Sequence, residues 1–217
     1  MEKIYLATSD KVKIAANFYP VAGPEGWILY VHMMPATKES WNDLARALQE
    51  LGYEGLAIDL RGHGESDEGP NGYRNFSDEE HQRSILDVEA AVDYLIRDRL
   101  AAKEKIYLVG ASIGANLSLQ YLSEHPEFTK AVLLSPGLDY RGIQTEPMAK
   151  KLRANQKVFF ASSRDDGSNA EENEQLSRLA STEVNIKIYP TAGHGTTILE
   201  KEPELKNLII DFLTKSK

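Results

Sequence analysis

The pentapeptide Gly110-Ala111-Ser112-Ile113-Gly114 constrains the fold of this chain more than any other segment. Residues 105–109, directly before it, form a short β-branched and aromatic run that is typical of a buried strand. Residues 115–122, directly after it, continue as a helix. A strand that turns into a helix on Gly-x-Ser-x-Gly holds its serine at a strained turn, with the hydroxyl exposed at the carboxyl edge of a sheet. This context predicts a nucleophilic Ser112, whereas the bare pentapeptide could also be a plain turn.

Composition excludes several classes of protein. The net charge of −8 at pH 7, with no Lys/Arg cluster, argues against a nucleic-acid partner. The chain has no cysteine, which excludes disulfides, thiolate catalysis and Cys-ligated zinc. The first ten residues lack a signal-peptide pattern, and no apolar run approaches the ~18 residues of a membrane span. We therefore expect a cytoplasmic protein without cofactor, metal or membrane association.

The strand and helix patterns alternate along most of the chain. Two strands joined by a short Ser-Asp-Lys turn open the sequence at 3–8 and 12–19, which predicts an antiparallel hairpin. Six further strands are expected at 27–31, 53–58, 105–109, 130–134, 157–161 and 185–189. Such alternation requires a mostly parallel sheet with helices on both faces. The length suits a single α/β domain over residues 1–217, of about eight strands.

Apolar stripes at helical spacing mark the core faces of the expected helices. One stripe runs from Trp41 to Leu51, and another from Ile85 to Ile96, preceded by a capping box at Ser77 and Glu80. A third stripe ends near Ala180, and residues 205–213 close the chain behind Pro203.

Three polar residues follow three successive late strands, in the order Ser, Asp, His. Ligands bind beyond the carboxyl ends of strands in a sheet of this kind, so Ser112, Asp166 and His194 are expected at one edge. A serine hydroxyl needs an adjacent base, a neutral imidazole can take its proton, and a carboxylate orients the imidazole. His194 lies between two glycines, which is hard to explain for a core histidine. Asp165 is the alternative acid, and otherwise caps a helix or faces water.

A developing oxyanion needs hydrogen-bond donors. The N–H of Ile113, at the start of the helix after Ser112, is one expected donor. The second is expected from the loop after residues 27–31, where we choose the N–H of Met33 because Pro35 has none. His32 in the same loop has a structural role or is a second base.

The whole chain resembles the α/β-hydrolase family. Four segments carry the resemblance: His32-Met33-Met34, residues 59–66 (Asp-Leu-Arg-Gly-His-Gly-Glu-Ser), Gly110–Gly114 and Gly193-His194-Gly195. The resemblance implies the α/β-hydrolase fold, a catalytic triad of Ser112, Asp166 and His194, and oxyanion donors at Met33 and Ile113. Many relatives have glycine where this chain has Met33, whose side chain would narrow the pocket. The resemblance assigns His63 a structural role.

The interval at about 136–156 leaves room for only a short lid-like insertion, a helix and a loop. A minimally covered site predicts a small ester as substrate, bound by His32, Met34 and Tyr140; simple turn packing is the alternative for Tyr140 and Asp139. The expected activity is that of a carboxylesterase working through an acyl-enzyme. The alternatives are a thioesterase, an acyltransferase, a perhydrolase, or a non-catalytic scaffold that binds a ligand or partner.

Overall fold

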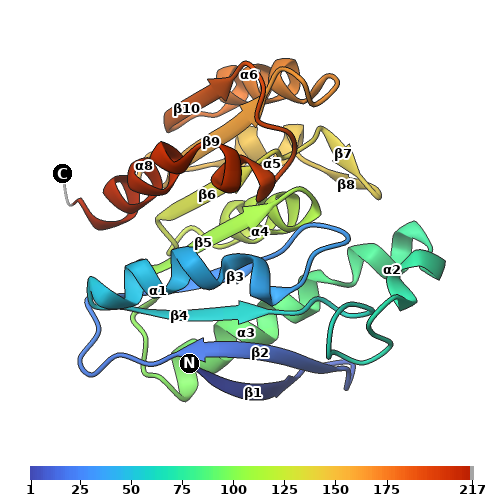
Figure 1. Ribbon diagram of the computed structural model, residues 1–217, viewed down its shortest axis with the longest axis vertical. Helices are drawn as coiled ribbons and strands as arrows, with labels where there is room; N and C mark the ends of the chain where they lie inside the picture. Colours follow the sequence, from blue (N-terminus) through green and yellow to red (C-terminus); the bar gives the residue numbers. More distant parts are fainter. Residues whose placement is uncertain (216–217) are drawn as a thin grey trace.

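A computed structural model describes residues 1–215 and contains an eight-stranded sheet in the order β1-β2-β4-β3-β5-β6-β9-β10 (Figure 1). The strands are β1 (Glu2–Ala7), β2 (Lys13–Tyr19), β3 (Gly26–Val31), β4 (Tyr53–Ile58), β5 (Ile106–Ala111), β6 (Lys130–Leu134), β9 (Lys157–Ser163) and β10 (Glu183–Tyr189). β2 pairs antiparallel with β1 and with β4, and the other neighbours are parallel. The expected mostly parallel sheet with an antiparallel amino-terminal hairpin is confirmed.

Helices cover both faces of the sheet, as expected. The longer helices are α1 (Asn42–Glu50), α3 (Ile85–Arg97), α4 (Ile113–Glu124), α6 (Asn169–Leu179) and α8 (Pro203–Thr214). One buried cluster packs α1 and α8 on one face, with residues such as Trp41 and Ile209. The other packs α3, α4 and α6 on the opposite face, with residues such as Val92 and Leu117. The central strands, such as β3, β4 and β6, are therefore buried on both sides, which accounts for their nearly continuous apolar sequences, whereas the edge strands β1 and β10 are partly exposed.

The helical stripes of the sequence match these helices with small differences. The capping box is present, since Ser77 Oγ accepts from the N–H of Glu80 at 3.3 Å, but it caps a separate short helix, α2 (Asp78–Gln82). Leu51 was expected in the core and is 51% exposed, because α1 ends one residue earlier.

The expected insertion contains one element that was not predicted. β7 (Asp139–Tyr140) and β8 (Ile143–Gln144) form a separate small hairpin, and the short helix α5 (Glu146–Lys151) follows it. The Asn116 side chain, on α4, donates to the carbonyls of Gly137 at 3.1 Å and Ile143 at 2.9 Å. The segment is thus bonded directly to the helix that begins after Ser112.

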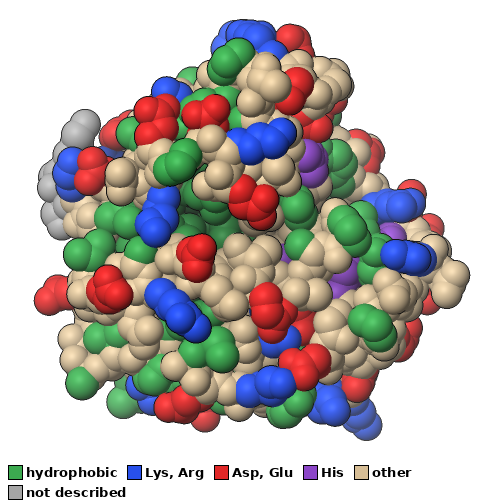
Figure 2. Space-filling model, viewed as in Figure 1, with side chains coloured by type: hydrophobic (Ala, Val, Ile, Leu, Met, Phe, Trp, Pro, Cys, Tyr) green, Lys and Arg blue, Asp and Glu red, His purple; other side chains and the backbone are tan. Residues whose placement is uncertain are grey.

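The surface carries charges of both signs. Figure 2 shows acidic and basic side chains interspersed over one face, with hydrophobic side chains between them. Within residues 1–215, no helix is both long and apolar enough to cross a membrane.

Candidate active site

Ser112 lies in a strained turn between β5 and α4. Its backbone has φ 52° and ψ −121°, in the positive-φ region that side-chain-bearing residues rarely adopt. The N–H of Ser112 donates to the carbonyl of Leu134 on neighbouring β6 at 2.8 Å, and the N–H of Ala115 donates to the Ser112 carbonyl at 2.9 Å. The turn is therefore held by the sheet on one side and by the helix on the other.

The two glycines of the pentapeptide are required by close backbone approach. A Cβ at Gly110 would lie 2.2 Å from the carbonyl oxygen of Gly114. A Cβ at Gly114 would lie 2.4 Å from the carbonyl oxygen of Val31 and 2.5 Å from that of His32. The first turn of α4 thus packs directly on the backbone that follows β3, where the second oxyanion donor was predicted.

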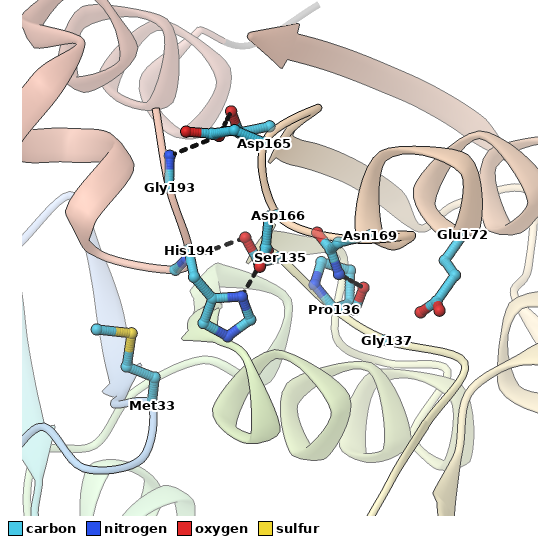
Figure 3. A network of polar contacts seen from close by, with 12 residues as sticks. Met33, Ser135, Pro136, Gly137, Asp165, Asp166, Asn169, Glu172, Gly193 and His194 are labelled. Atoms are coloured by element: carbon cyan, nitrogen blue, oxygen red, sulfur yellow. Dashed lines mark hydrogen bonds and ion pairs between the residues drawn. The ribbon is translucent and has the colours of Figure 1, made fainter. Parts of the chain in front are cut away.

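His194 and Asp166 contact each other across the loops after β10 and β9. Nδ1 of His194 lies 2.6 Å from Oδ2 of Asp166, and both side chains are partly exposed (33% and 21%). Figure 3 shows the His194 ring pointing toward the Asp166 carboxylate. An ionised carboxylate can accept hydrogen bonds but cannot donate them. This contact therefore places the proton on Nδ1 of His194 and leaves Nε2 free to act as a base.

The glycines beside His194 allow the loop to turn around it. Gly193 has φ 76° and Gly195 has φ 57°, which a residue with a side chain adopts only at a cost. The N–H of Gly195 donates to Oγ of Ser135 at 2.9 Å, immediately after β6. This contact connects the histidine loop to the end of a second strand.

Asp165 also contacts the histidine loop. Its Oδ1 accepts from the N–H groups of Ala192 at 3.1 Å and Gly193 at 3.0 Å, and from the hydroxyl of Ser163. These hydrogen bonds, that from Ser163 foremost, hold the pKa of Asp165 below its usual value. The alternative that Asp165 caps a helix or only faces water is wrong, because its carboxylate binds backbone N–H groups of the loop before His194.

The two expected oxyanion donors lie in the loop after β3 (Met33) and at the first position of α4 (Ile113). The Ile113 N–H belongs to the first turn of α4, so it has no intrahelical partner. The Met33 carbonyl accepts from the N–H of Ala36 at 2.8 Å, which holds the loop backbone in place. The Met33 side chain reaches the histidine loop, since a Cβ at Gly195 would lie 2.4 Å from the Met33 sulfur (Figure 3).

The prediction that His32 binds the substrate is wrong. The residue has no exposed surface, and both ring nitrogens have partners: the Met33 carbonyl at Nδ1 (2.9 Å) and the N–H of Leu60 at Nε2 (3.0 Å). Nδ1 therefore carries the proton and Nε2 accepts. Burial lowers the pKa of His32 to about 4, so the ring stays neutral and holds the loop.

Tyr140, on the β7–β8 hairpin, contacts both Ser112 and His194. Its ring meets the His194 ring edge to face, with centroids 6.3 Å apart. Its hydroxyl accepts from the Asn169 amide at 3.2 Å, donates to the carbonyl of Ser135 at 3.3 Å and lies beside the Ser112 side chain. Burial and the charge of Asp166 raise its pKa, so the phenol stays protonated.

The remaining expected contacts occupy different places. Met34 is half-buried and packs against the core cluster of α3, α4 and α6. Asp139 accepts from the N–H of Gly142 at 2.7 Å and closes the β7–β8 turn, as in the turn-packing alternative. His63 is buried and stacks on Tyr73, with ring centroids 4.0 Å apart, which fits a structural role.

Sequence reasoning missed two residues that border this site, Ser135 and Asn169. Ser135 contacts Gly195, as described above, and Asn169 donates to the carbonyl of Pro136 at 2.8 Å as well as to Tyr140 (Figure 3). A signal was available for Ser135, because it is the first polar residue after β6 and the carboxyl ends of parallel strands meet at one edge. Asn169 has no such signal.

Comparison with known proteins points to one fold. Residues 26–184 match the family described as the alpha/beta hydrolase fold. A non-heme chloroperoxidase of Kitasatospora aureofaciens is 31% identical over 132 residues, which is 59% of this chain and 42% of that protein. A Bacillus subtilis protein named "putative 2-succinyl-6-hydroxy-2,4-cyclohexadiene-1-carboxylate synthase" is 29% identical over 150 residues. The match covers 67% of this chain and 50% of that protein. The chain thus spans about half the length of these curated relatives.

Solved structures of similar shape include esterases. An esterase of Exiguobacterium antarcticum has a TM-score of 0.77 at 14% sequence identity. The alignment covers 99% of this chain and 100% of the esterase. An esterase of Pyrococcus furiosus has a TM-score of 0.75 at 19% identity, covering 98% of this chain and 89% of its own. At such identities the likeness is one of fold.

Proposed function

This chain belongs to the α/β-hydrolase fold family, and on that premise we propose that it is a serine hydrolase that cleaves small carboxylic esters. Ser112 is the proposed nucleophile, His194 the base and Asp166 the acid that orients it. The observation that carries the proposal is the 2.6 Å contact between Asp166 and Nδ1 of His194, at the same sheet edge as the strained Ser112.

The proposed reaction begins with proton transfer from the Ser112 hydroxyl to Nε2 of His194, while Oγ attacks the ester carbonyl carbon. The imidazolium that forms is stabilised by the Asp166 carboxylate. Collapse of the tetrahedral intermediate breaks the bond to the alkoxide, which takes the proton from His194 and leaves as an alcohol. Water then attacks the acyl-enzyme by the same proton route and releases the carboxylic acid and free Ser112.

The tetrahedral oxyanion needs donors that are already in place. We assign the N–H groups of Met33 and Ile113 to this role. Support comes from the close approach of Gly114 to the carbonyls of Val31 and His32, which brings the start of α4 against the loop after β3. Buried, neutral His32 holds that loop without taking part in proton transfer.

Small acyl groups are the proposed substrates because the insertion after β6 is short and bonded to the domain. Tyr140 stands beside Ser112 and His194, and it lies so close to Gly137 that a Cβ there would be 2.5 Å from Cζ of the ring. We propose that Tyr140 limits the space for the acyl chain and that Met34, in the loop after β3, contributes a further apolar contact.

The likeness to a non-heme chloroperoxidase favours one second candidate, in which hydrogen peroxide replaces water in attacking the acyl-enzyme and a peracid is released. The same triad serves both reactions, since only the acceptor of the acyl group changes. Peracid formation from an ester and added peroxide, measured against carboxylic acid formation, distinguishes the two.

A fluorophosphonate probe tests the proposal directly, together with p-nitrophenyl esters of rising chain length. We expect the wild-type protein to be labelled and Ser112→Ala to remain unlabelled. The same substitution is expected to lower kcat by roughly four to six orders of magnitude while the protein stays folded. A folded Ser112→Ala variant that keeps most of its activity would refute the proposal, and an unlabelled, inactive wild type would favour a non-catalytic scaffold.

A further inference from the structure

We infer that Asp165 is a positioning residue that holds the loop of His194 in its reactive position by hydrogen bonds to the loop backbone. The inference rests on the function proposed above, because it gives His194 the role of base. It assigns separate tasks to two adjacent carboxylates: Asp166 binds the imidazole and Asp165 binds the main chain that carries it.

The hydrogen bonds of Asp165 connect the ends of β9 and β10. Oδ1 accepts from the N–H groups of Ala192 at 3.1 Å and Gly193 at 3.0 Å. The Ser163 hydroxyl donates to the same carboxylate, while Ser163 Oγ accepts from Ala192 at 2.7 Å. Figure 3 shows Asp165 directed toward Gly193, and Asp166, the next residue, directed toward the imidazole.

These hydrogen bonds fix the backbone of Gly193, the residue immediately before His194. Gly193 has φ 76°, and because glycine has no side chain its backbone is free to adopt other conformations as well. The hydrogen bond from the Gly193 N–H to Asp165 fixes the peptide plane before Gly193. It therefore restricts the position of the His194 backbone, from which the imidazole extends. Without the Asp165 carboxylate, the loop keeps its contacts with Asp166, Ser135 and Ser163, but the N–H groups of Ala192 and Gly193 lose their carboxylate acceptor.

The two aspartates can be separated by what each contact requires. Asp165 only accepts hydrogen bonds from neutral N–H and O–H groups, which an amide oxygen also does. Asp166 is proposed to stabilise a positively charged imidazolium, which an amide does not do. Asp165→Asn should therefore restore most of what Asp165→Ala removes, and Asp166→Asn should not be tolerated.

The experiment measures kcat and KM for p-nitrophenyl acetate and the rate constant of fluorophosphonate labelling, at a temperature where circular dichroism shows every variant folded. We expect Asp165→Ala to lower kcat and the labelling rate about 10- to 100-fold, as for a small displacement of a catalytic group, with little change in KM. Asp165→Asn should stay within about threefold of wild type, given the equivalent acceptor. Arg164→Ala is the matched control, since Arg164 pairs with Glu171 and Glu174 at the surface, and it should match wild type.

Other outcomes overturn the inference in distinguishable ways. Wild-type labelling of Ser112 together with an unchanged rate in Asp165→Ala would refute the positioning role and leave the proposed function intact. An equally large loss in Asp165→Asn and Asp165→Ala would show that the charge is required, so that a backbone acceptor role is wrong. Full activity in Ser112→Ala would refute the proposed function and this inference together.

Discussion

Asp166 accepts a hydrogen bond from Nδ1 of His194 at 2.6 Å although 28 residues separate them in the sequence. The contact orients the ring so that Nε2 is the basic nitrogen. Its loss leaves an imidazole free to adopt the wrong tautomer.

Asp166→Asn is therefore expected to lower kcat by about 10⁴ while the fold is retained. Steady-state kinetics with p-nitrophenyl acetate measure the loss, and thermal unfolding followed by circular dichroism checks the fold. Asp93→Asn, which alters an exposed ion pair on α3, is the control and should keep wild-type kinetics. If Asp166→Asn were as active as this control, the acid would have to lie elsewhere.

Gly114→Ala is expected to reduce both stability and activity. The added Cβ would lie 2.4 Å from the Val31 carbonyl oxygen, so α4 has to move away from the loop that carries the Met33 N–H. We expect a loss of about 1–3 kcal/mol in the free energy of unfolding, typical of overpacking, and a lower kcat. Urea unfolding and ester kinetics measure the two effects.

The control for this glycine is Gly23→Ala. Gly23 has φ 65° but no atom within 4 Å of a Cβ, so it tests backbone strain without a clash. We expect a loss of about 1–2 kcal/mol from strain and no change in kcat. Equal kinetics in the two glycine variants would contradict the role of close approach at Gly114.

The preference for short over long acyl chains should depend on Tyr140. The wild type should prefer acetate and butyrate over esters of twelve or more carbons, because the Tyr140 ring stands beside Ser112 and His194. Tyr140→Ala should raise kcat/KM for long chains relative to short ones, whereas Tyr140→Phe, which keeps the ring, should leave the chain-length order unchanged. A wild type that prefers long chains would contradict the assignment.

Stability should fall on mild acidification because of buried His63. Burial, with nearby His32, lowers the pKa of His63 to about 3, whereas a histidine in the unfolded chain has a pKa of about 6.5. Below pH 6.5 His63 binds a proton in the unfolded state but not in the folded state. The contribution of neutral His63 to the free energy of unfolding is therefore complete above this pH and is lost as the pH falls. Between pH 7.5 and 5 this linkage costs about 2 kcal/mol.

The variant His63→Phe isolates that contribution, because buried groups with other pKa shifts, such as Asp87, remain in both proteins. Denaturant unfolding at pH 7.5 and 5 should show a smaller drop for the variant than for the wild type, by about 2 kcal/mol. Equal drops would mean that His63 takes up its proton in the folded state as readily as in the unfolded one.

Local sequence signals were sufficient for the sheet and for the choice of candidate residues. Strands were recognisable from β-branched and aromatic runs, and helices from apolar stripes, because both patterns depend on residues close in sequence. Parallel strands end at one edge, so residues that follow them, such as Ser112 and His194, could be expected near one another. Leu51 was misplaced because a helix end depends on the turn that follows it, here at Gly52.

Tertiary structure decided what each polar residue contacts. Asp165 binds the loop of His194, and His32 is buried against Leu60, through hydrogen bonds between segments far apart in the chain. Tyr140 reaches Ser112 and His194 because Asn116 and Asn169 hold the hairpin in place. Loop conformations at strand ends have no periodicity, and their hydrogen bonds form only once the sheet has brought those ends together. The sequence by itself therefore determined the sheet and the candidates, and the packed loops determined their roles.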